Sequence, residues 1–211
     1  MHNGSGYDFH QFVKMAKIVQ KLFPVVKVLG KTSEKFSMIE FRSGSKSGKI
    51  PIILKDTANF LAGSLDTHVS NLREKCEIQE SDTSQKIVEK QAKVFKHLHQ
   101  YFQENWVDKQ GVDPLAFQYI VRKGVYPYSF CSNFDVFNTT SLPEQKAFKN
   151  DLKDKDINEE DYEHAQRVWS AFKCQTFADY SKLYLETDTL LLSDVMELFR
   201  ASMRKEYNLG E

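Results

Sequence analysis

The chain has 211 residues, of which 41 % are hydrophobic and 27 % charged, a balance typical of a globular protein. Equal numbers of basic and acidic side chains give a formal net charge of zero, so a nucleic-acid site would depend on a local patch. No apolar stretch approaches the roughly 20 residues of a membrane span, and the N-terminus lacks the pattern of a signal peptide. Three widely spaced cysteines favour neither a disulfide framework nor a metal-ligand set, and indicate a reducing, intracellular compartment.

The N-terminal third predicts a helix followed by a small sheet. Apolar residues at helical spacing predict a helix from Asp8 to Leu22, and Pro24 ends it. Segments rich in β-branched and aromatic residues then predict three short strands, at residues 25–29, 36–41 and 50–54. The Gly/Ser-rich connection at 42–49 would close a hairpin, and helical spacing returns at 57–74.

The rest of the chain predicts helices joined by irregular segments. After a polar loop at 77–83, one apolar stripe predicts a single long helix from Ser84 to Asn105. Residues 106–156 contain scattered prolines and are expected to be irregular. Two further helices are predicted, one in the stretch 156–173, which starts with acidic residues, and one from about 176 to about 208. The expected fold class is therefore α/β, with a small mixed sheet near the N-terminus and then mostly helices.

The last predicted helix carries a phenol and a carboxylate four residues apart, Tyr184 and Asp188. On a helix this spacing places both side chains on one face. Either the face is solvated, which is the ordinary arrangement, or Asp188 faces a metal ion. Taken alone, the pair does not separate these two interpretations.

Two other stretches have ordinary structural explanations. The sequence HNGSGYD, residues 2–8, ends in an aspartate that would serve as a helix N-cap. In GSLDTHV, residues 63–69, Ser64 would cap a helix while Leu65 packs inward. Each short motif is weak evidence of function by itself.

A fourth stretch, RKGVYPY at residues 122–128, combines two cations with two aromatic rings. This mixture suits a single strand of nucleic acid, because a cation meets the phosphate while a ring stacks on a base. A surface loop with its tyrosines packed on the core would have the same composition.

In this order, HNGSGYD, SLDTHV, RKGVYPY and YLETDTLLLSDV resemble the motifs of one protein family. They are similar to the 3′–5′ exonuclease region of protein-primed family B DNA polymerases, above all the polinton-type group. The stretches LPEQKAF and INEEDYEHAQRVW resemble the same group. The resemblance extends from His2 to about Tyr207, and it implies an RNase H-like fold with a helical insertion around 77–175.

The resemblance implies a role for individual residues. Asp8 and Asp188 would hold the catalytic metal, Mg²⁺ or Mn²⁺, while Tyr184 orients the attacking water. Lys123 would support the carboxylates and the scissile phosphate. The residues implied to hold the 3′ end of single-stranded DNA are His2, Asn3, Tyr7, Ser64, Leu65 and Tyr128. A terminal protein primer would be a second partner, and the nucleus or a viral or mobile-element replication site would be the place of action.

The chain departs from the family pattern at both ends. The family's first exonuclease motif, an Asp-x-Glu pair, precedes the second motif, and this sequence begins at the second motif. The first strand or strands of the RNase H-like sheet and the polymerase palm are likewise missing. We therefore expect residues 1–211 to be a partial exonuclease domain that binds metal weakly and has little activity alone.

Two alternatives stay open. The chain could be a non-catalytic DNA-binding or interaction module derived from a decayed mobile-element replicase, or a plain helical interaction protein. The exonuclease interpretation predicts that the carboxylates of Asp8 and Asp188 lie within roughly 8 Å of each other, as two bridged cations permit. It also predicts that Lys123 and Tyr128 line the same cleft as Asp8.

Overall fold

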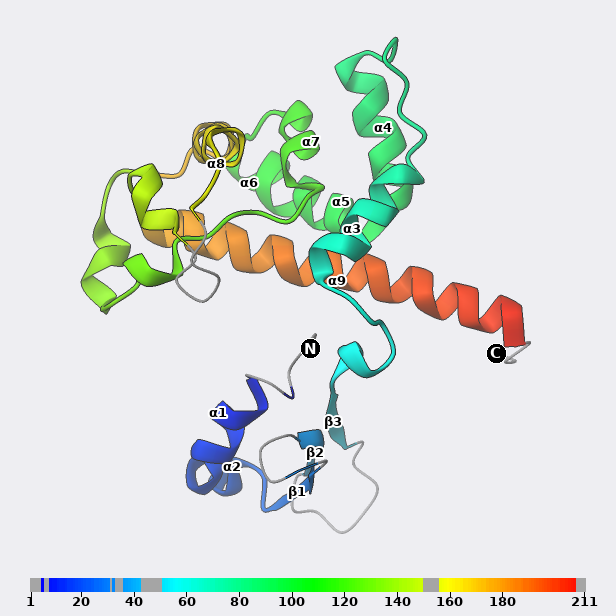
Figure 1. The fold of residues 1–211 in the computed structure, drawn as a ribbon, viewed down its shortest axis with the longest axis vertical. Coiled ribbons are helices and arrows are strands. Elements are labelled where there is room, and N and C mark those ends of the chain that lie inside the picture. The colour runs from blue at the N-terminus through cyan, green and yellow to red at the C-terminus, as the bar shows by residue number, and fades with distance from the viewer. Residues whose placement is uncertain are drawn as a thin grey trace. The chain divides into compact units, whose positions relative to one another are not determined.

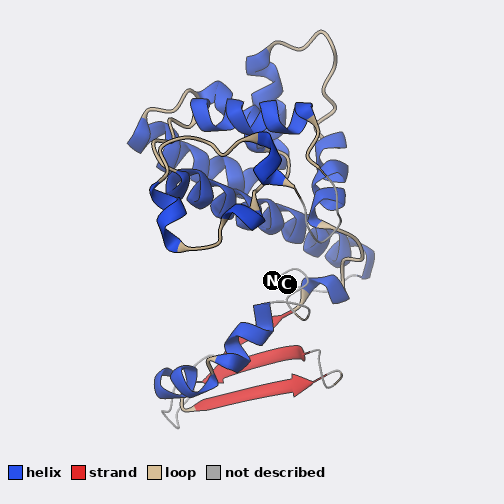
Figure 2. Ribbon diagram, turned by 60° about the vertical axis from the view of Figure 1, so that its left-hand side comes forward, coloured by secondary structure: helices blue, strands red, loops and turns tan. Residues whose placement is uncertain are grey.

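A computed structural model describes the chain at Ser5, 8–30, Thr32, 36–42, 51–149 and 156–207. The chain divides into two compact units, Met1–Ser64 and Leu65–Glu211, here called unit 1 and unit 2 (Figure 1). Unit 1 combines two short helices with a sheet, and the described part of unit 2 consists of helices and loops (Figure 2). No helix in the described part of the chain is both long enough and apolar enough to span a membrane.

Unit 1 contains a three-stranded sheet in the order β1-β2-β3. The described elements of the unit are α1 (Asp8–Lys14), α2 (Ala16–Leu22), β1 (Val25–Gly30), β2 (Phe36–Arg42), β3 (Ile52–Lys55) and a 3₁₀ helix at Thr57–Asn59. The three strands predicted from the sequence are confirmed, but all described strands pair antiparallel, so the expectation of a mixed sheet is wrong for them. The reason is the length of the connections, which are shorter than the dozen or more residues that a parallel crossover needs.

The core of unit 1 is small. In the strand register, Val26 lies opposite Phe41 and Ile39 lies opposite Leu54, so these side chains share one face of the sheet. Phe9 from α1 packs on that face and is fully buried. The single helix predicted from Asp8 to Leu22 is wrong: the chain turns at residue 15, and two short helices pack where one was expected.

Unit 2 is built around one long helix. Its α-helices are α3 (Leu65–Glu74), α4 (Ser84–Val94), α5 (Lys96–Phe102), α6 (Asp108–Gln110), α7 (Phe117–Ile120), α8 (Glu159–Ala171) and α9 (Phe177–Tyr207). The 31-residue helix α9, orange to red in Figure 1, packs against α3 and α5. It also contacts the 3₁₀ helix Phe134–Asn138. The two helices predicted after residue 156 are thus confirmed.

Aromatic rings fill the centre of unit 2. Phe102 is fully buried, and its ring contacts those of Trp106, Phe117 and Phe172 at centroid distances of 6.0, 5.3 and 6.0 Å. Such tilted and edge-to-face pairs add to the free energy already gained from burying the rings. Unit 2 therefore has a core of its own.

The prediction of one continuous helix from Ser84 to Asn105 is wrong. The chain leaves the helical conformation at Phe95, which separates α4 from α5, and a π-helix at Gln103–Val107 follows α5. The break frees the first N–H groups of α5. The carboxylate of Asp194, on α9, accepts hydrogen bonds from the N–H groups of His97 and Leu98 at 2.8 and 3.1 Å. A partner from a distant helix thus compensates for the interruption.

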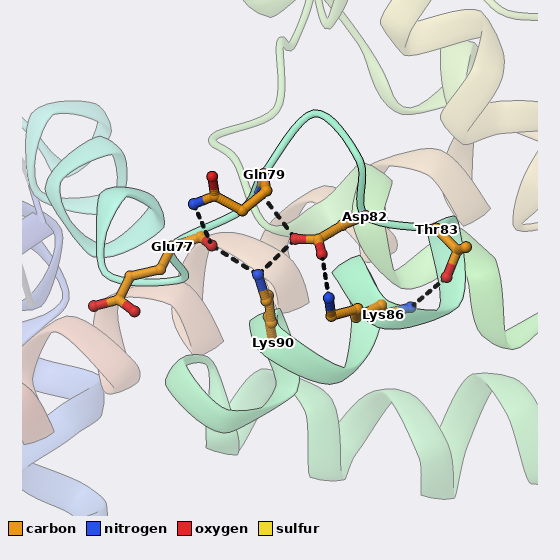
Figure 3. Close-up of polar contacts among 6 residues, drawn as sticks. All are labelled: Glu77, Gln79, Asp82, Thr83, Lys86 and Lys90. Atoms are coloured by element: carbon orange, nitrogen blue, oxygen red, sulfur yellow. Dashed lines mark hydrogen bonds and ion pairs between the residues drawn. The ribbon is translucent and has the colours of Figure 1, made fainter.

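The polar loop predicted at 77–83 is confirmed, and a cluster of charges fixes it to α4 (Figure 3). The Asp82 carboxylate forms ion pairs with the ammonium groups of Lys86 and Lys90, and it accepts a hydrogen bond from the N–H of Gln79. Lys90 also donates to the carbonyl of Glu77 at 2.8 Å. These bonds, led by that from Lys86, hold the pKa of the Asp82 carboxyl well below its usual range.

Candidate functional site

Helix α9 places Tyr184 and Asp188 one turn apart on the same face. Tyr184 is 8 % exposed, and the Asp188 side chain is 24 % exposed. The face thus runs from the buried Tyr184 to the partly exposed Asp188. Exposure alone does not separate a partly solvated helix face from a metal site.

The irregular segment that follows α7 brings Lys123 to this face. The Lys123 ammonium donates to the Asp188 carboxylate and to the Tyr184 hydroxyl, each at 3.0 Å. It also lies 5.3 Å from the centre of the Tyr184 ring. Because the pair is partly buried, it is screened less by solvent than an exposed surface pair.

Tyr128 completes the cluster. Its hydroxyl lies 2.9 Å from the Tyr184 hydroxyl, while the residue as a whole is 66 % exposed. One end of the side chain is therefore fixed at the site, and much of the ring is accessible to a ligand. We call Lys123, Tyr128, Tyr184 and Asp188 the candidate site.

Two residues that sequence reasoning missed hold Tyr184 in place. The Tyr126 ring stacks on the Tyr184 ring at a centroid distance of 4.7 Å. At Gly124, a Cβ atom would come within 3.2 Å of the Tyr184 ring, so a larger residue would displace the ring or the loop. The glycine directly after Lys123 was the available signal, since a residue without a side chain permits such an approach.

Further tyrosine contacts join the loop to α9. The Tyr180 hydroxyl donates to the carbonyl of Val125 at 2.8 Å, and the Tyr126 hydroxyl lies 2.9 Å from the Ser181 hydroxyl. Burial raises the pKa of Tyr126 to about 12. Burial, together with the nearby Asp188 charge, also raises the pKa of Tyr184. Both phenols consequently keep their protons at neutral pH.

One oxygen of Asp188 has no partner among the described residues. Its Oδ2 atom is bonded to Lys123, whereas Oδ1 is buried and makes no hydrogen bond there. A buried carboxylate oxygen without a partner carries a desolvation cost. Such an atom suits a further donor or a cation.

The described residues do not form a metal site by themselves. Among them, no group of three His, Cys, Asp or Glu side chains could hold a metal ion. The candidate site offers one carboxylate, and an ammonium already occupies one of its oxygens. Mg²⁺ rarely binds tightly through so few protein ligands unless substrate phosphates contribute.

The other predicted site residues lie apart from this cluster in the sequence. Asp8 belongs to unit 1, where it is exposed in the first turn of α1, and Ser64 is exposed at the end of that unit. Leu65 is the half-buried first residue of α3 in unit 2. His2, Asn3 and Tyr7 lie outside the described residues. The expected convergence of Asp8 with the candidate site stays a prediction.

Two buried carboxylates of unit 1 have structural partners. Asp56 accepts hydrogen bonds from the N–H groups of Ser5 and Ala58, each at 3.0 Å. Glu40, 7 % exposed, forms an ion pair with Arg42. The burial of both carboxylates is thus accounted for by contacts within unit 1.

The chain matches no protein-family model, no curated protein and no solved structure.

Proposed function

We propose that the chain is the proofreading 3′–5′ exonuclease region of a protein-primed DNA polymerase, and that its candidate site binds the 3′ end of single-stranded DNA. The observation that supports this most is the hydrogen-bonded cluster. Lys123 bonds to both Asp188 and Tyr184, and Tyr128 bonds to Tyr184. The resemblance names these four residues in two stretches that are far apart in the sequence, and the fold brings them together.

Each side chain suits its proposed task. The exposed Tyr128 ring stacks on a base near the 3′ end, and the Lys123 ammonium meets the phosphate. The Tyr184 hydroxyl, held between Lys123 and Tyr128, orients a water molecule toward that phosphate. When bound, Mg²⁺ or Mn²⁺ would activate the water and stabilise the leaving oxygen. Asp188 would be a ligand in unit 2, and Asp8 is the ligand that the resemblance assigns to unit 1.

The finer features of the proposal concern the fold and the partners. The small sheet and helices of unit 1, together with α9, would belong to an RNase H-like domain, with the segment around 77–175 as its family-specific helical insertion. A terminal protein primer would be a partner of the complete polymerase. The place of action would be the site where a virus or mobile element replicates, or the nucleus.

The binding step can be tested with a 5′-labelled oligothymidine and fluorescence anisotropy. Tyr128→Ala should weaken binding by about 1–3 kcal/mol, the usual loss of one base-stacking contact. Tyr128→Phe keeps the ring and removes the bond to Tyr184, so it should retain most of the affinity. Tyr162→Phe, which removes a hydroxyl bonded to the carbonyl of Pro143, is the matched control and should have no effect.

Equal affinity of Tyr128→Ala and the wild type would contradict the proposed binding site. A preference for duplex over single-stranded DNA would contradict it as well, because a stacking residue needs an unpaired base.

The hydrolytic step is expected to be feeble in the 211-residue chain. The described residues offer a single carboxylate at the candidate site, so metal binding should be weak and should depend on DNA phosphates. The test is degradation of a 5′-labelled single strand at millimolar Mg²⁺ or Mn²⁺, with Asp188→Ala as the control. Robust 3′–5′ degradation that disappears in the control would overturn this expectation.

A second candidate function is a DNA-binding or interaction module without catalysis, derived from a decayed replicase. The Lys123–Asp188 ion pair favours it, because the carboxylate charge is balanced without a metal. The two functions differ in their response to metal. An exonuclease site should bind the 3′ end more tightly with Mn²⁺ than with a chelator, whereas the module should bind equally in both.

A further inference from the structure

A continuous row of aromatic rings leads away from the candidate site. The rings of Tyr128, Tyr126, Phe177, Phe137 and Phe134 contact one another in this order, with centroid distances of 5.1, 5.7, 5.9 and 6.4 Å. The three middle residues are buried or half-buried, whereas the two end residues are exposed. Tyr128 is 66 % exposed and Phe134 is 88 % exposed.

The backbone that carries Phe134 is fixed, although its side chain is in solvent. Phe134 begins a 3₁₀ helix, and the side chain of the preceding Asn133 accepts the N–H of Asp135 at 2.9 Å. Just after this helix, the carbonyl of Thr139 accepts the N–H of Phe177 at 2.7 Å. The Phe134 side chain therefore starts from a held backbone and contributes little burial to the fold.

One exposed cation lies near the start of the row, and one exposed carboxylate lies near its end. The 3₁₀ helix Gln145–Phe148 contacts the 3₁₀ helix Tyr128–Phe130 and carries the exposed Lys146. This lysine is paired with Glu144 in an exposed ion pair, which a phosphate can replace at little cost. The exposed carboxylate of Asp135 disfavours a phosphate beside Phe134, so a base fits that position better.

We propose that Phe134 is a second base-stacking residue, which binds an unpaired base on the 5′ side of the one at Tyr128. The inference rests on the proposed function, because the single strand is taken to end at the candidate site. A single exposed apolar residue needs no explanation by itself. The row that connects Phe134 with Tyr128 is what marks it as part of a longer strand-binding surface.

The test is a series of 5′-labelled oligothymidines, from about two to about twelve nucleotides, with affinity measured by anisotropy on the full chain. Phe134→Ala should not change the affinity of the shortest strands, which reach only Tyr128. Beyond a threshold length it should weaken binding by roughly 5-fold to 100-fold, the loss of one stacked base. Tyr128→Ala should weaken binding at every length.

Two further variants separate stacking from simple apolar contact. Phe134→Trp should keep or increase the affinity for long strands, and Phe134→Leu should lose most of it, because leucine has no π-face. All three variants should keep the wild-type thermal midpoint, since the side chain is in solvent.

Equal affinity of Phe134→Ala and the wild type at all lengths would overturn the inference, and so would full binding by Phe134→Leu. If Tyr128→Ala had no effect while Phe134→Ala weakened long strands, the second stacking position would stand and the proposed 3′-end site would fall. If instead Tyr128→Ala weakened binding and Phe134→Ala had no effect, the proposed function would stand and only the role of Phe134 would be refuted.

Discussion

The two units differ most in how well they bury their own apolar side chains. Unit 1 has a buried core of Phe9, Ile39 and Phe41, and most of the large apolar side chains that are exposed in the described part of the chain belong to it. Unit 2 buries a network of aromatic rings around Phe102. A domain as small as unit 1 buries a smaller fraction of its surface and is correspondingly marginal. Unit 2 should therefore be the more stable part.

The units also differ in what they contribute to the candidate site. In unit 2, Lys123, Tyr128, Tyr184 and Asp188 are joined by hydrogen bonds. In unit 1, the exposed Asp8 is a metal ligand only by the resemblance. Base stacking at Tyr128 should consequently depend on unit 2, whereas the metal and strand contacts implied for unit 1 should depend on Asp8, His2, Asn3, Tyr7 and Ser64.

The largest effect is expected in the core of unit 2. Phe102→Ala should destabilise this unit by about 3–5 kcal/mol, because it leaves a cavity among three aromatic rings. Urea unfolding followed by tryptophan fluorescence measures the loss, since Trp106 contacts the Phe102 ring. Phe134→Leu is the control and should leave the unfolding midpoint unchanged. A loss below about 1 kcal/mol would show that the aromatic core is not the source of the unit's stability.

The corresponding change in unit 1 should unfold that unit alone. Phe9→Ala removes one of the three buried core side chains among the described residues of unit 1. The free energy of unfolding should fall by about 3 kcal/mol, which is enough to unfold a marginally stable unit. Hydrogen exchange should then show loss of protection in β1, β2 and β3, with α9 still protected. The part of oligothymidine binding that Tyr128→Ala removes should persist, because Tyr128 belongs to unit 2. If both units lost protection together, the division into a marginal and a robust unit would be wrong.

Acid should weaken unit 2 through a buried histidine. Burial, with repulsion from Arg122 and Arg167, lowers the pKa of His164 to about 4. The unfolded chain binds this proton at about pH 6.5, so folding stability should fall as the pH falls from about 6.5 to about 4, by roughly 3 kcal/mol in total. His164→Gln should remove this pH dependence, and the exposed His97→Gln is the control. An unchanged pH profile in His164→Gln would refute the assignment.

The smallest effect is expected at the loop of Figure 3. Asp82→Ala removes the partner of Lys86 and Lys90 and should lower the thermal midpoint of unit 2 only slightly, because Lys86 is exposed and the cluster holds only a short, mostly exposed loop to α4. Since the pKa of Asp82 is lowered in the folded chain, this contribution is present above its usual pKa and is lost as the pH falls below it. Calorimetry at neutral and at acid pH measures both. A larger effect of the variant at acid pH would contradict the account.

Local sequence patterns predict much of the fold, but they miss features that depend on contacts between residues far apart in the sequence. The strands of unit 1 and the helix that begins after Asn158 follow from side-chain type and capping residues, which act over a few positions. The break at Phe95 does not, because it depends on Asp194, nearly a hundred residues away in the sequence. Spacing alone cannot show that a distant carboxylate will cap the helix after the break.

The same distinction applies to the candidate site. The pairing of Tyr184 with Asp188 follows from helical spacing, and the exposed Tyr128 follows from the composition of its loop. The close packing of Gly124 and Tyr126 on Tyr184 depends on how the loop crosses α9. Such tertiary contacts leave no periodic signal in the sequence. Phe134 was missed for the opposite reason, since a single aromatic residue in an irregular segment resembles an ordinary core position.

The most direct test of the central claim, that the chain is an exonuclease region, asks whether Asp8 and Asp188 hold the same metal. The EPR signal of free Mn²⁺ can be followed as the full chain and oligothymidine are added together. We predict that the signal falls in the wild type, and that Asp8→Asn and Asp188→Asn each restore it, while the exposed Asp66→Asn in α3 does not. Mn²⁺ binding that is unaffected by Asp8→Asn or by Asp188→Asn would contradict the proposed site.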